Sequence, residues 1–210
     1  MIPMDDVNNE QLSSRMIDFQ SLLNQFLDIQ RMIHLPDGKQ TDRRETDTEH
    51  SYHLAMIGWY LCGSFPHLDK NKVIQYGLVH DLVEIHAGDV MAVGRTAEQE
   101  KLKDFKEAQA LERLEQEWPD FSEMTKTIHT FESQTDPESV FVKALDKILP
   151  MVHNVMSTGK TWKKYNLDRK VIIDLKDNKT APSPEITAIW QEFKKTIMDH
   201  PEFFNKGKAN

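Results

Sequence analysis

Between Tyr76 and Val90 the sequence places two histidines and three carboxylates among apolar residues. These ionisable residues are His80, Asp81, Glu84, His86 and Asp89. Most of the other positions are Leu, Val or Ile, which is typical of a helix buried on most of its surface. An unpaired buried charge is strongly unfavourable, so such a helix must neutralise its ionisable groups. A divalent metal ion is one ligand that satisfies a histidine and several carboxylates together.

Residue spacing alone leaves this metal hypothesis open. His50 and His53 are three residues apart on an expected helix, so both can face one ligand. His80 and Glu84 are four residues apart and can likewise share a face. Adjacent helical residues are about 100° apart around the axis, so His80 and Asp81 should not share one. The alternative is that these histidines pack in the core and the acids line a solvated surface.

The hydrophobic pattern predicts an all-α protein. Apolar residues at helical spacing and capping signals indicate helices at about 10–33, 47–62, 70–86, 97–118, 121–132, 137–156 and 184–199. Residues 157–166 have the composition of a loop. Residues 167–175 are ambiguous, because the run Val171-Ile172-Ile173 has strand propensity.

Composition limits the classes of protein to which the chain can belong. The 210 residues suit one domain, and their net charge of −8 argues against nucleic-acid binding, which needs basic surface. The single cysteine, Cys62, excludes an internal disulfide and a cysteine-based zinc site. No signal-peptide pattern is present, and no apolar run approaches the ~20 residues that cross a bilayer. We therefore expect a cytoplasmic protein without a membrane partner.

Three motifs in a fixed order resemble those of the HD-domain metal-dependent phosphohydrolases. They are Glu49-His50-Ser51, then His80-Asp81 about thirty residues later with Glu84 and Gly88-Asp89 behind it, and finally Lys143-Ala144-Leu145-Asp146. The resemblance covers roughly residues 19–153 and is greatest to the 5′-deoxynucleotidase branch. It implies one HD domain over residues 1–210, an all-α helical bundle with a core at about 19–157 and a C-terminal helical extension at about 158–210.

The resemblance also implies roles for individual residues. By motif, the metal ligands would be His50, His80, Asp81 and Asp146. This set suits one divalent ion, Mn²⁺, Co²⁺, Fe²⁺, Ni²⁺ or Zn²⁺, which would activate a water for attack on a phosphate ester. Glu84 would be the catalytic acid or base, and Asp89 would help to place the sugar and the nucleophile. Asp89 is equally well suited to a simple turn.

Phosphate binding also requires a cationic side chain, and arginine is well suited to that role. In the family an arginine near the end of the first helix binds phosphate, which corresponds to Arg31. A second arginine precedes the Glu-His-Ser motif, which corresponds to Arg43 or Arg44. The alternative for each of these arginines is an ordinary solvated residue on the surface. Met32 follows Arg31 where the best-known deoxynucleotidases have Trp, so the preference for deoxyribose stays open.

The function implied by the resemblance is hydrolysis of (deoxy)nucleoside 5′-monophosphates, which are small-molecule substrates. One alternative is a triphosphohydrolase of deoxynucleoside triphosphates with the same metal site. Another is a non-catalytic HD domain that binds a nucleotide. Proteins of this type are often homodimers, so a homodimer is expected here.

Overall fold

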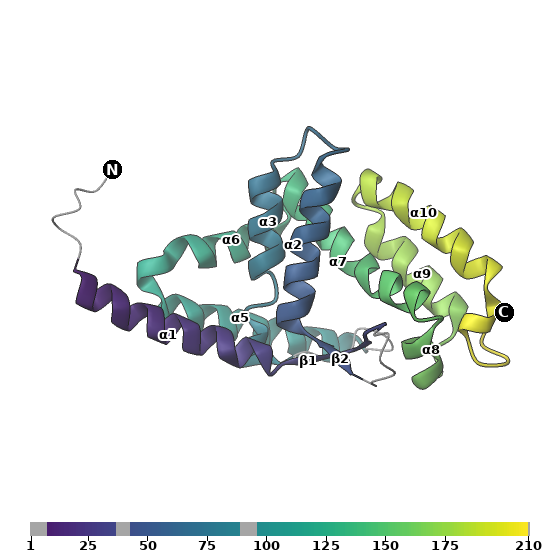
Figure 1. The fold of residues 1–210 in the computed structure, drawn as a ribbon, viewed down its shortest axis with the longest axis horizontal. Coiled ribbons are helices and arrows are strands. Elements are labelled where there is room, and N and C mark those ends of the chain that lie inside the picture. The colour runs from purple at the N-terminus through teal and green to yellow at the C-terminus, as the bar shows by residue number, and fades with distance from the viewer. Residues whose placement is uncertain (1–7, 37–42, 89–95, 210) are drawn as a thin grey trace.

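The computed structural model describes residues 8–36, 43–88 and 96–209. These residues are mainly helical, with one small two-stranded sheet, which confirms the all-α expectation (Figure 1). The longer helices are α1 (Asn9–Leu27), α2 (Asp47–Cys62), α3 (Lys70–Val79), α5 (Ala97–Glu117), α6 (Ser122–Ser133), α7 (Pro137–Met156), α9 (Arg169–Thr180) and α10 (Pro184–Asp199). The shorter elements are α4 (Glu84–Ala87), α8 (Lys160–Lys164), the 3₁₀ turns η2 (Pro119–Phe121) and η3 (Pro201–Phe203), and the antiparallel strands β1 (Gln30–His34) and β2 (Arg44–Thr46).

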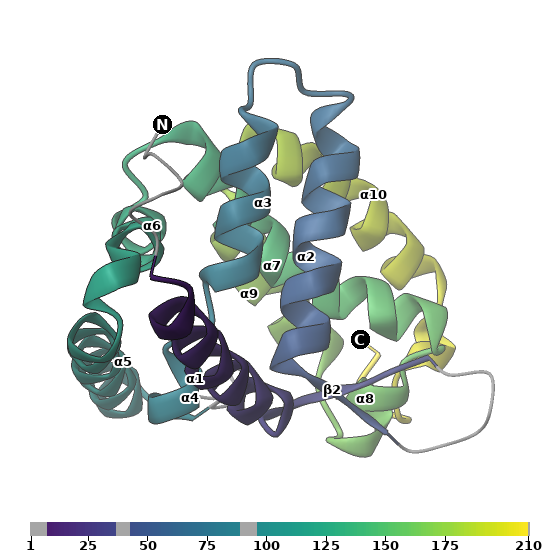
Figure 2. The same ribbon diagram turned by 60° about the vertical axis from the view of Figure 1, so that its left-hand side comes forward.

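Helices α2 and α3 run antiparallel and pack side by side (Figures 1 and 2). Their close approach depends on Gly77, where an added Cβ would lie 2.7 Å from the Ala55 Cα atom. Helix α7 packs against both helices. None of the helices in the described residues is both long and apolar enough to cross a membrane.

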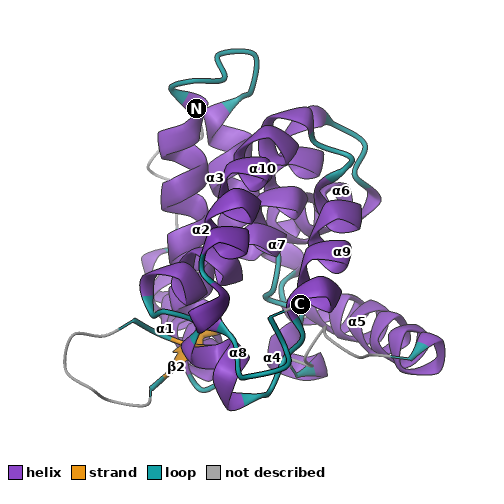
Figure 3. Cartoon of the chain, turned by 90° about the vertical axis from the view of Figure 1, so that its right-hand side faces the viewer, coloured by secondary structure: helices purple, strands orange, loops and turns teal. Residues whose placement is uncertain are grey.

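Two clusters of buried apolar residues lie on either side of this central pair. The first joins α7, α9 and α10 to α2 and α3, and contains Trp162, Ile172 and Trp190. The second joins α1, α5 and α6, and contains Leu82 and Val83 from the segment between α3 and α4. The strands lie at one corner of the molecule beside α8 (orange in Figure 3), where the His34 amide donates to Thr161 Oγ1 at 3.0 Å.

Three segments differ from their predicted structure. The first helix was predicted to reach residue 33, but it ends at Leu27 and is followed by β1, which pairs with β2. Residues 157–166 were predicted as a loop, but they include the short helix α8. The ambiguous segment that follows is helix α9, capped by Asp168 and buried through Ile172 and Ile173. Burial against α7 therefore outweighs the strand propensity of the β-branched run.

Candidate functional site

The segment between α3 and α4 brings two adjacent residues to one site. Helix α3 ends at Val79 with His80 as its cap, residues 81–83 form a turn, and α4 begins at Glu84. This break turns Asp81 towards its neighbour, so that His80 Nε2 lies 2.9 Å from Asp81 Oδ2. The prediction of one helix as far as His86 is therefore wrong. The expectation that His80 and Asp81 face apart assumed a continuous helix, so it does not apply.

His50 on α2 and Asp146 on α7 meet the same site from other directions. His50 is fully buried, and its Nε2 atom lies 2.8 Å from Asp146 Oδ1. The ring centroids of His50 and His80 are 5.3 Å apart. Potential ligand atoms of His50, His80 and Asp146 all lie within 4.8 Å of one another. With Asp81 beside His80, the four residues expected to bind a metal converge on one point.

The surroundings of His80 suit a metal ligand. Its Nδ1 atom donates to the Gly77 carbonyl oxygen at 3.1 Å. Its Nε2 atom is buried and faces Asp81 Oδ2, so the two ring nitrogens have different partners. A carbonyl that accepts from the ring in this way is common behind metal-binding histidines. The site therefore fits a divalent ion with two imidazole and two carboxylate ligands.

Among the candidate ligands, the histidine on α2 has a raised pKa. Burial and the nearby Arg31 lower the pKa of His50, but hydrogen bonds with Asp146 and Glu45 outweigh both and raise it to about 9. A bound metal must displace a proton from His50, because only the neutral imidazole coordinates. Metal binding should therefore release a proton at neutral pH.

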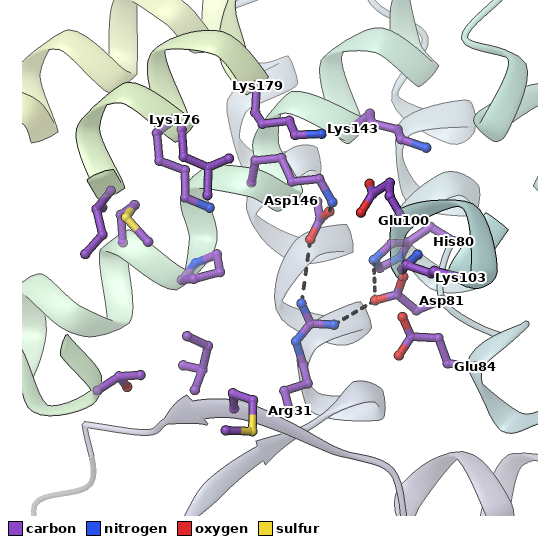
Figure 4. Close-up of a pocket in the computed structure, with 18 of the residues that line it drawn as sticks. Arg31, His80, Asp81, Glu84, Glu100, Lys103, Lys143, Asp146, Lys176 and Lys179 are labelled. Atoms are coloured by element: carbon purple, nitrogen blue, oxygen red, sulfur yellow. Dashed lines mark hydrogen bonds and ion pairs between the residues drawn. The ribbon is translucent and has the colours of Figure 1, made fainter. Parts of the chain in front are cut away.

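Arg31 on β1 joins the carboxylates of the site to one another (Figure 4). Its Nη1 donates to Asp81 Oδ2 at 2.8 Å and to Asp47 Oδ1 at 3.0 Å, and its Nη2 lies 3.9 Å from Asp146 Oδ1. Burial and the neighbouring Asp81 nevertheless raise the pKa of Asp47 to about 6, against the opposing effect of Arg31. The site therefore holds more negative charge than Arg31 alone neutralises, which favours a further cation.

Glu45 on β2 lies behind the candidate ligands and is fully buried. Its Oε1 atom is 3.0 Å from His153 Nε2 and 3.3 Å from His53 Nδ1, while Oε2 is 3.6 Å from His50 Nδ1. Burial raises the pKa of Glu45, but the hydrogen bonds from these histidines prevail and lower it below its ordinary range. Glu45 thus places a buried carboxylate directly behind His50. No pattern in the sequence singled it out, although it has the inward-facing central position of a three-residue strand.

Three of the candidate ligands, His80, Asp81 and Asp146, line a cavity of about 550 Å³. Glu84 lines this cavity and is only 4% exposed. One oxygen each of Glu84, Asp47 and Asp81 lies within 4.8 Å of the others, so Glu84 is next to the candidate metal ligands. Met32 also lines the cavity. Asp89 lies outside the described residues.

The three arginines expected at the phosphate occupy different positions. Arg31 lines the cavity. Arg43 donates to Glu49 Oε2 at 2.8 Å, and Arg44 donates to Gln30 Oε1 at 2.7 Å. Neither Arg43 nor Arg44 is among the described residues that line the cavity. Of the three, only Arg31 therefore faces the site.

Comparison with known proteins agrees with this arrangement. Residues 28–190 match the HD domain family. The chain belongs to this family. Its membership confirms the resemblance found in the three motifs, and the matched range includes His50, His80, Asp81 and Asp146.

Individual relatives are similar over part or most of the chain. The 5′-deoxynucleotidase HDDC2 of Xenopus laevis is 32% identical over 111 residues, 52% of this chain and 53% of that protein. The human 5′-deoxynucleotidase HDDC2 is 26% identical over 111 residues, 52% of each chain. The chain thus spans about half the length of these curated relatives. A crystal structure described as a predicted metal-dependent phosphohydrolase from Magnetospirillum magnetotacticum superposes with a TM-score of 0.75 at 25% identity, over 92% of this chain and 98% of that one.

Proposed function

We propose that this HD domain protein is a metal-dependent phosphohydrolase that removes phosphate from nucleoside 5′-monophosphates, deoxynucleotides among them. The observation that carries the proposal is the convergence of His50, His80, Asp81 and Asp146 beside a cavity lined by Glu84. The names of the similar proteins support the same class of reaction. The cavity volume also suits a nucleotide-sized ligand, since small-molecule sites commonly enclose about 300–1,000 Å³.

In this mechanism the four candidate ligands would hold one divalent ion. When bound, such an ion polarises a phosphoryl oxygen and lowers the pKa of a water. Glu84 accepts the proton of the attacking water as the new bond to phosphorus forms. The bond from phosphorus to the 5′ oxygen breaks, and Glu84 returns the proton to that oxygen. Asp89 remains the candidate for positioning the sugar.

The residues behind the site keep these groups in place. The Gly77 carbonyl accepts the Nδ1 proton of His80, and Glu45 accepts from the histidines around it. Arg31 holds Asp81 on the side of the strands. Apolar residues of α7 and α9, Met151 and Ile172 among them, line part of the cavity and exclude water from it.

A triphosphohydrolase of deoxynucleoside triphosphates is the second candidate. The observation that favours it is the number of lysines that line the cavity: Lys103, Lys143, Lys147, Lys176 and Lys179. Lys176 and Lys179, with which no carboxylate of the described residues pairs, offer positive charge to more than one phosphate group. The two reactions differ in product, orthophosphate for one and tripolyphosphate for the other.

The test is a phosphate-release assay on metal-stripped protein with Mn²⁺, Co²⁺, Ni²⁺, Zn²⁺ or Mg²⁺ restored singly. The substrates are deoxy- and ribonucleoside mono- and triphosphates. Metal-dependent orthophosphate from monophosphates is the expected result. Tripolyphosphate from triphosphates would favour the second candidate, and no product with any metal would overturn both.

A further inference from the structure

Most of the cationic side chains around the cavity already contact a carboxylate. The pairs are Arg31 with Asp81, Lys147 with Asp146, Lys143 with Glu132, and Lys103 with Glu107. A cation held in this way offers less of its charge to an incoming anion, because the carboxylate already compensates it. The positive charges of these four side chains are therefore largely compensated by carboxylates of the protein itself.

Lys176 and Lys179 on α9 differ from these four cations. Within the part of the chain that the structure describes, neither side-chain amine makes a hydrogen bond or an ion pair. They are three residues apart, so they lie on one face of the helix. That face lines the cavity, on the side away from Arg31 (Figure 4). Two uncompensated amines thus face the space beside the candidate metal ligands.

Lys176 occupies a position where packing alone would favour an apolar residue. It lies one turn after Ile172 and one turn before Thr180, both of which are buried, and it is itself only 7% exposed. Burial and the positive charge of Lys147 lower its pKa to about 7. A lysine that is largely buried, with an unpaired amine at the cavity wall, is unfavourable for the folded protein. A leucine or methionine would fill the same position without this cost.

The acids of the site make an additional cation necessary for phosphate. Asp47, Asp81, Glu84 and Asp146 lie together at the candidate metal centre. They would repel a phosphate dianion, and Arg31 and Lys147 are already paired with two of them. A divalent ion offsets only part of this charge. Lys176 and Lys179 supply positive charge from the opposite wall.

We propose that Lys176, with Lys179 beside it, binds phosphoryl oxygens of the substrate on the α9 wall of the cavity. The inference rests on the proposed function, because it takes the anion to be a phosphate of that substrate. The oxygens belong either to the phosphate that is hydrolysed or to a further phosphate of a triphosphate. Both share the same chemistry, and the choice of substrate distinguishes them.

The first experiment measures orthophosphate binding by calorimetry on the metal-loaded full chain. We expect Lys176→Met to weaken binding at least about tenfold, because the variant loses a charged hydrogen-bond donor to the anion. Lys176→Arg should keep most of the affinity, because it restores the charge. The matched control is Lys170→Met on the same helix, since Lys170 is exposed and paired with Asp174. Metal content should be the same in all variants.

The second experiment measures KM and kcat for a nucleoside monophosphate and a triphosphate. A rise in KM for the monophosphate with Lys176→Met assigns the lysine to the hydrolysed phosphate. A rise for the triphosphate alone assigns it to a further phosphate. Unchanged KM for both, together with unchanged orthophosphate affinity, would overturn the inference while the hydrolase remained. Weakened orthophosphate binding in a protein that hydrolyses no nucleotide would instead reject the proposed function and keep the anion site.

Discussion

Substitution of Glu84 distinguishes a role in proton transfer from a role in metal binding. It is buried and adjoins Asp81, but it is not one of the four candidate ligands. We expect Glu84→Gln to retain the metal and to lose at least about 10²-fold in kcat, the usual contribution of a general acid or base. Metal analysis and steady-state kinetics on the same sample check this.

Asp81→Ala is the comparison, because it should lose the metal as well as the activity. Normal turnover by Glu84→Gln protein would show that another group moves the proton. Loss of metal from that variant would instead make Glu84 a ligand.

Substitution of Glu45 measures how much a buried carboxylate behind the candidate ligands contributes to metal affinity. Its carboxylate contacts His53, His153 and His50 and is fully buried. We expect Glu45→Gln to weaken metal affinity about 10–100-fold, the usual effect of removing a group that orients a metal-binding histidine. Competitive metal titration with a chelator measures it.

The matched control for Glu45 is Glu115→Gln, since Glu115 forms a histidine–carboxylate pair with His129 on the surface. Its metal affinity should equal that of the wild type. Equal affinity in both variants would mean that Glu45 serves only the fold.

Among the elements, the break between α3 and α4 decides whether the site exists. The sequence from Tyr76 to His86 contains Gly77 but no proline, and its apolar residues continue on both sides of the break. Nothing local therefore signals an end at His80. In the structure Asp81 contacts Arg31 of β1 while Leu82 and Val83 pack with α1, α5 and α6, which are long-range contacts. Helical periodicity carries no information about such long-range contacts. The order of the motifs therefore predicted that His80 and Asp81 act together, whereas their spacing did not.

Helix α9 illustrates the same limit for the opposite wall of the cavity. Because Val171, Ile172 and Ile173 left the segment ambiguous, the inward face of the helix could not be assigned. In the sequence, Lys176 is one of several lysines in a charged stretch. Its position became informative only with the packing of α9 against α7, which tertiary contacts determine.

The crossing of α2 and α3 makes a prediction at the level of elements. A Cβ on Gly77 would meet Ala55 Cα at 2.7 Å and Ala55 N at 2.8 Å, and backbone atoms cannot yield as a side chain can. We expect Gly77→Ala to lower the free energy of unfolding by about 1–3 kcal/mol, the usual cost of overpacking. Metal affinity should fall as well, since the helices that carry His50 and His80 must separate.

Urea unfolding and metal titration measure both effects. Gly63→Ala is the control, because Gly63 has a helical φ of −61° and its added Cβ would approach only Tyr60 O, at 3.3 Å. A Gly77→Ala protein as stable as wild type would show that the helices separate without cost.

In the molecule as a whole, the site lies where the two apolar clusters meet. One cluster contains Tyr76 and the α7 residue Leu145, and the other contains Leu82 and Val83. In the sequence, His80 and Asp81 lie between Tyr76 and Leu82, and Asp146 directly follows Leu145. Each cluster is stabilised by apolar burial, whereas the space between them collects charge. The candidate site therefore lies between the apolar clusters, where the burial of charged groups costs stability.

Substitution of Lys176 measures how much stability the protein loses by keeping a functional charge in its interior. Its pKa of about 7 is below the ordinary 10.5, so between these values the unfolded chain binds a proton that the folded chain does not. Stability should therefore rise with pH across this window, and the cost of the buried amine should be complete below pH 7. Without phosphate, Lys176→Met should have a higher free energy of unfolding than the wild type at pH 6. The difference should be on the order of 5 kcal/mol, since the pKa falls from 10.5 to about 7 and each pKa unit corresponds to ~1.4 kcal/mol.

The difference between Lys176→Met and wild type should shrink towards zero as the pH approaches 10.5, the ordinary pKa of lysine. Urea unfolding of both proteins at pH 6, 8.5 and 10 measures it, and Lys170→Met should differ from wild type by the same small amount throughout. Added orthophosphate should narrow the gap at pH 6, because the anion stabilises only the protein that retains the charged amine. A Lys176→Met protein less stable than wild type at pH 6 would contradict the cost assigned to this lysine, since burial would then favour the amine over an apolar side chain.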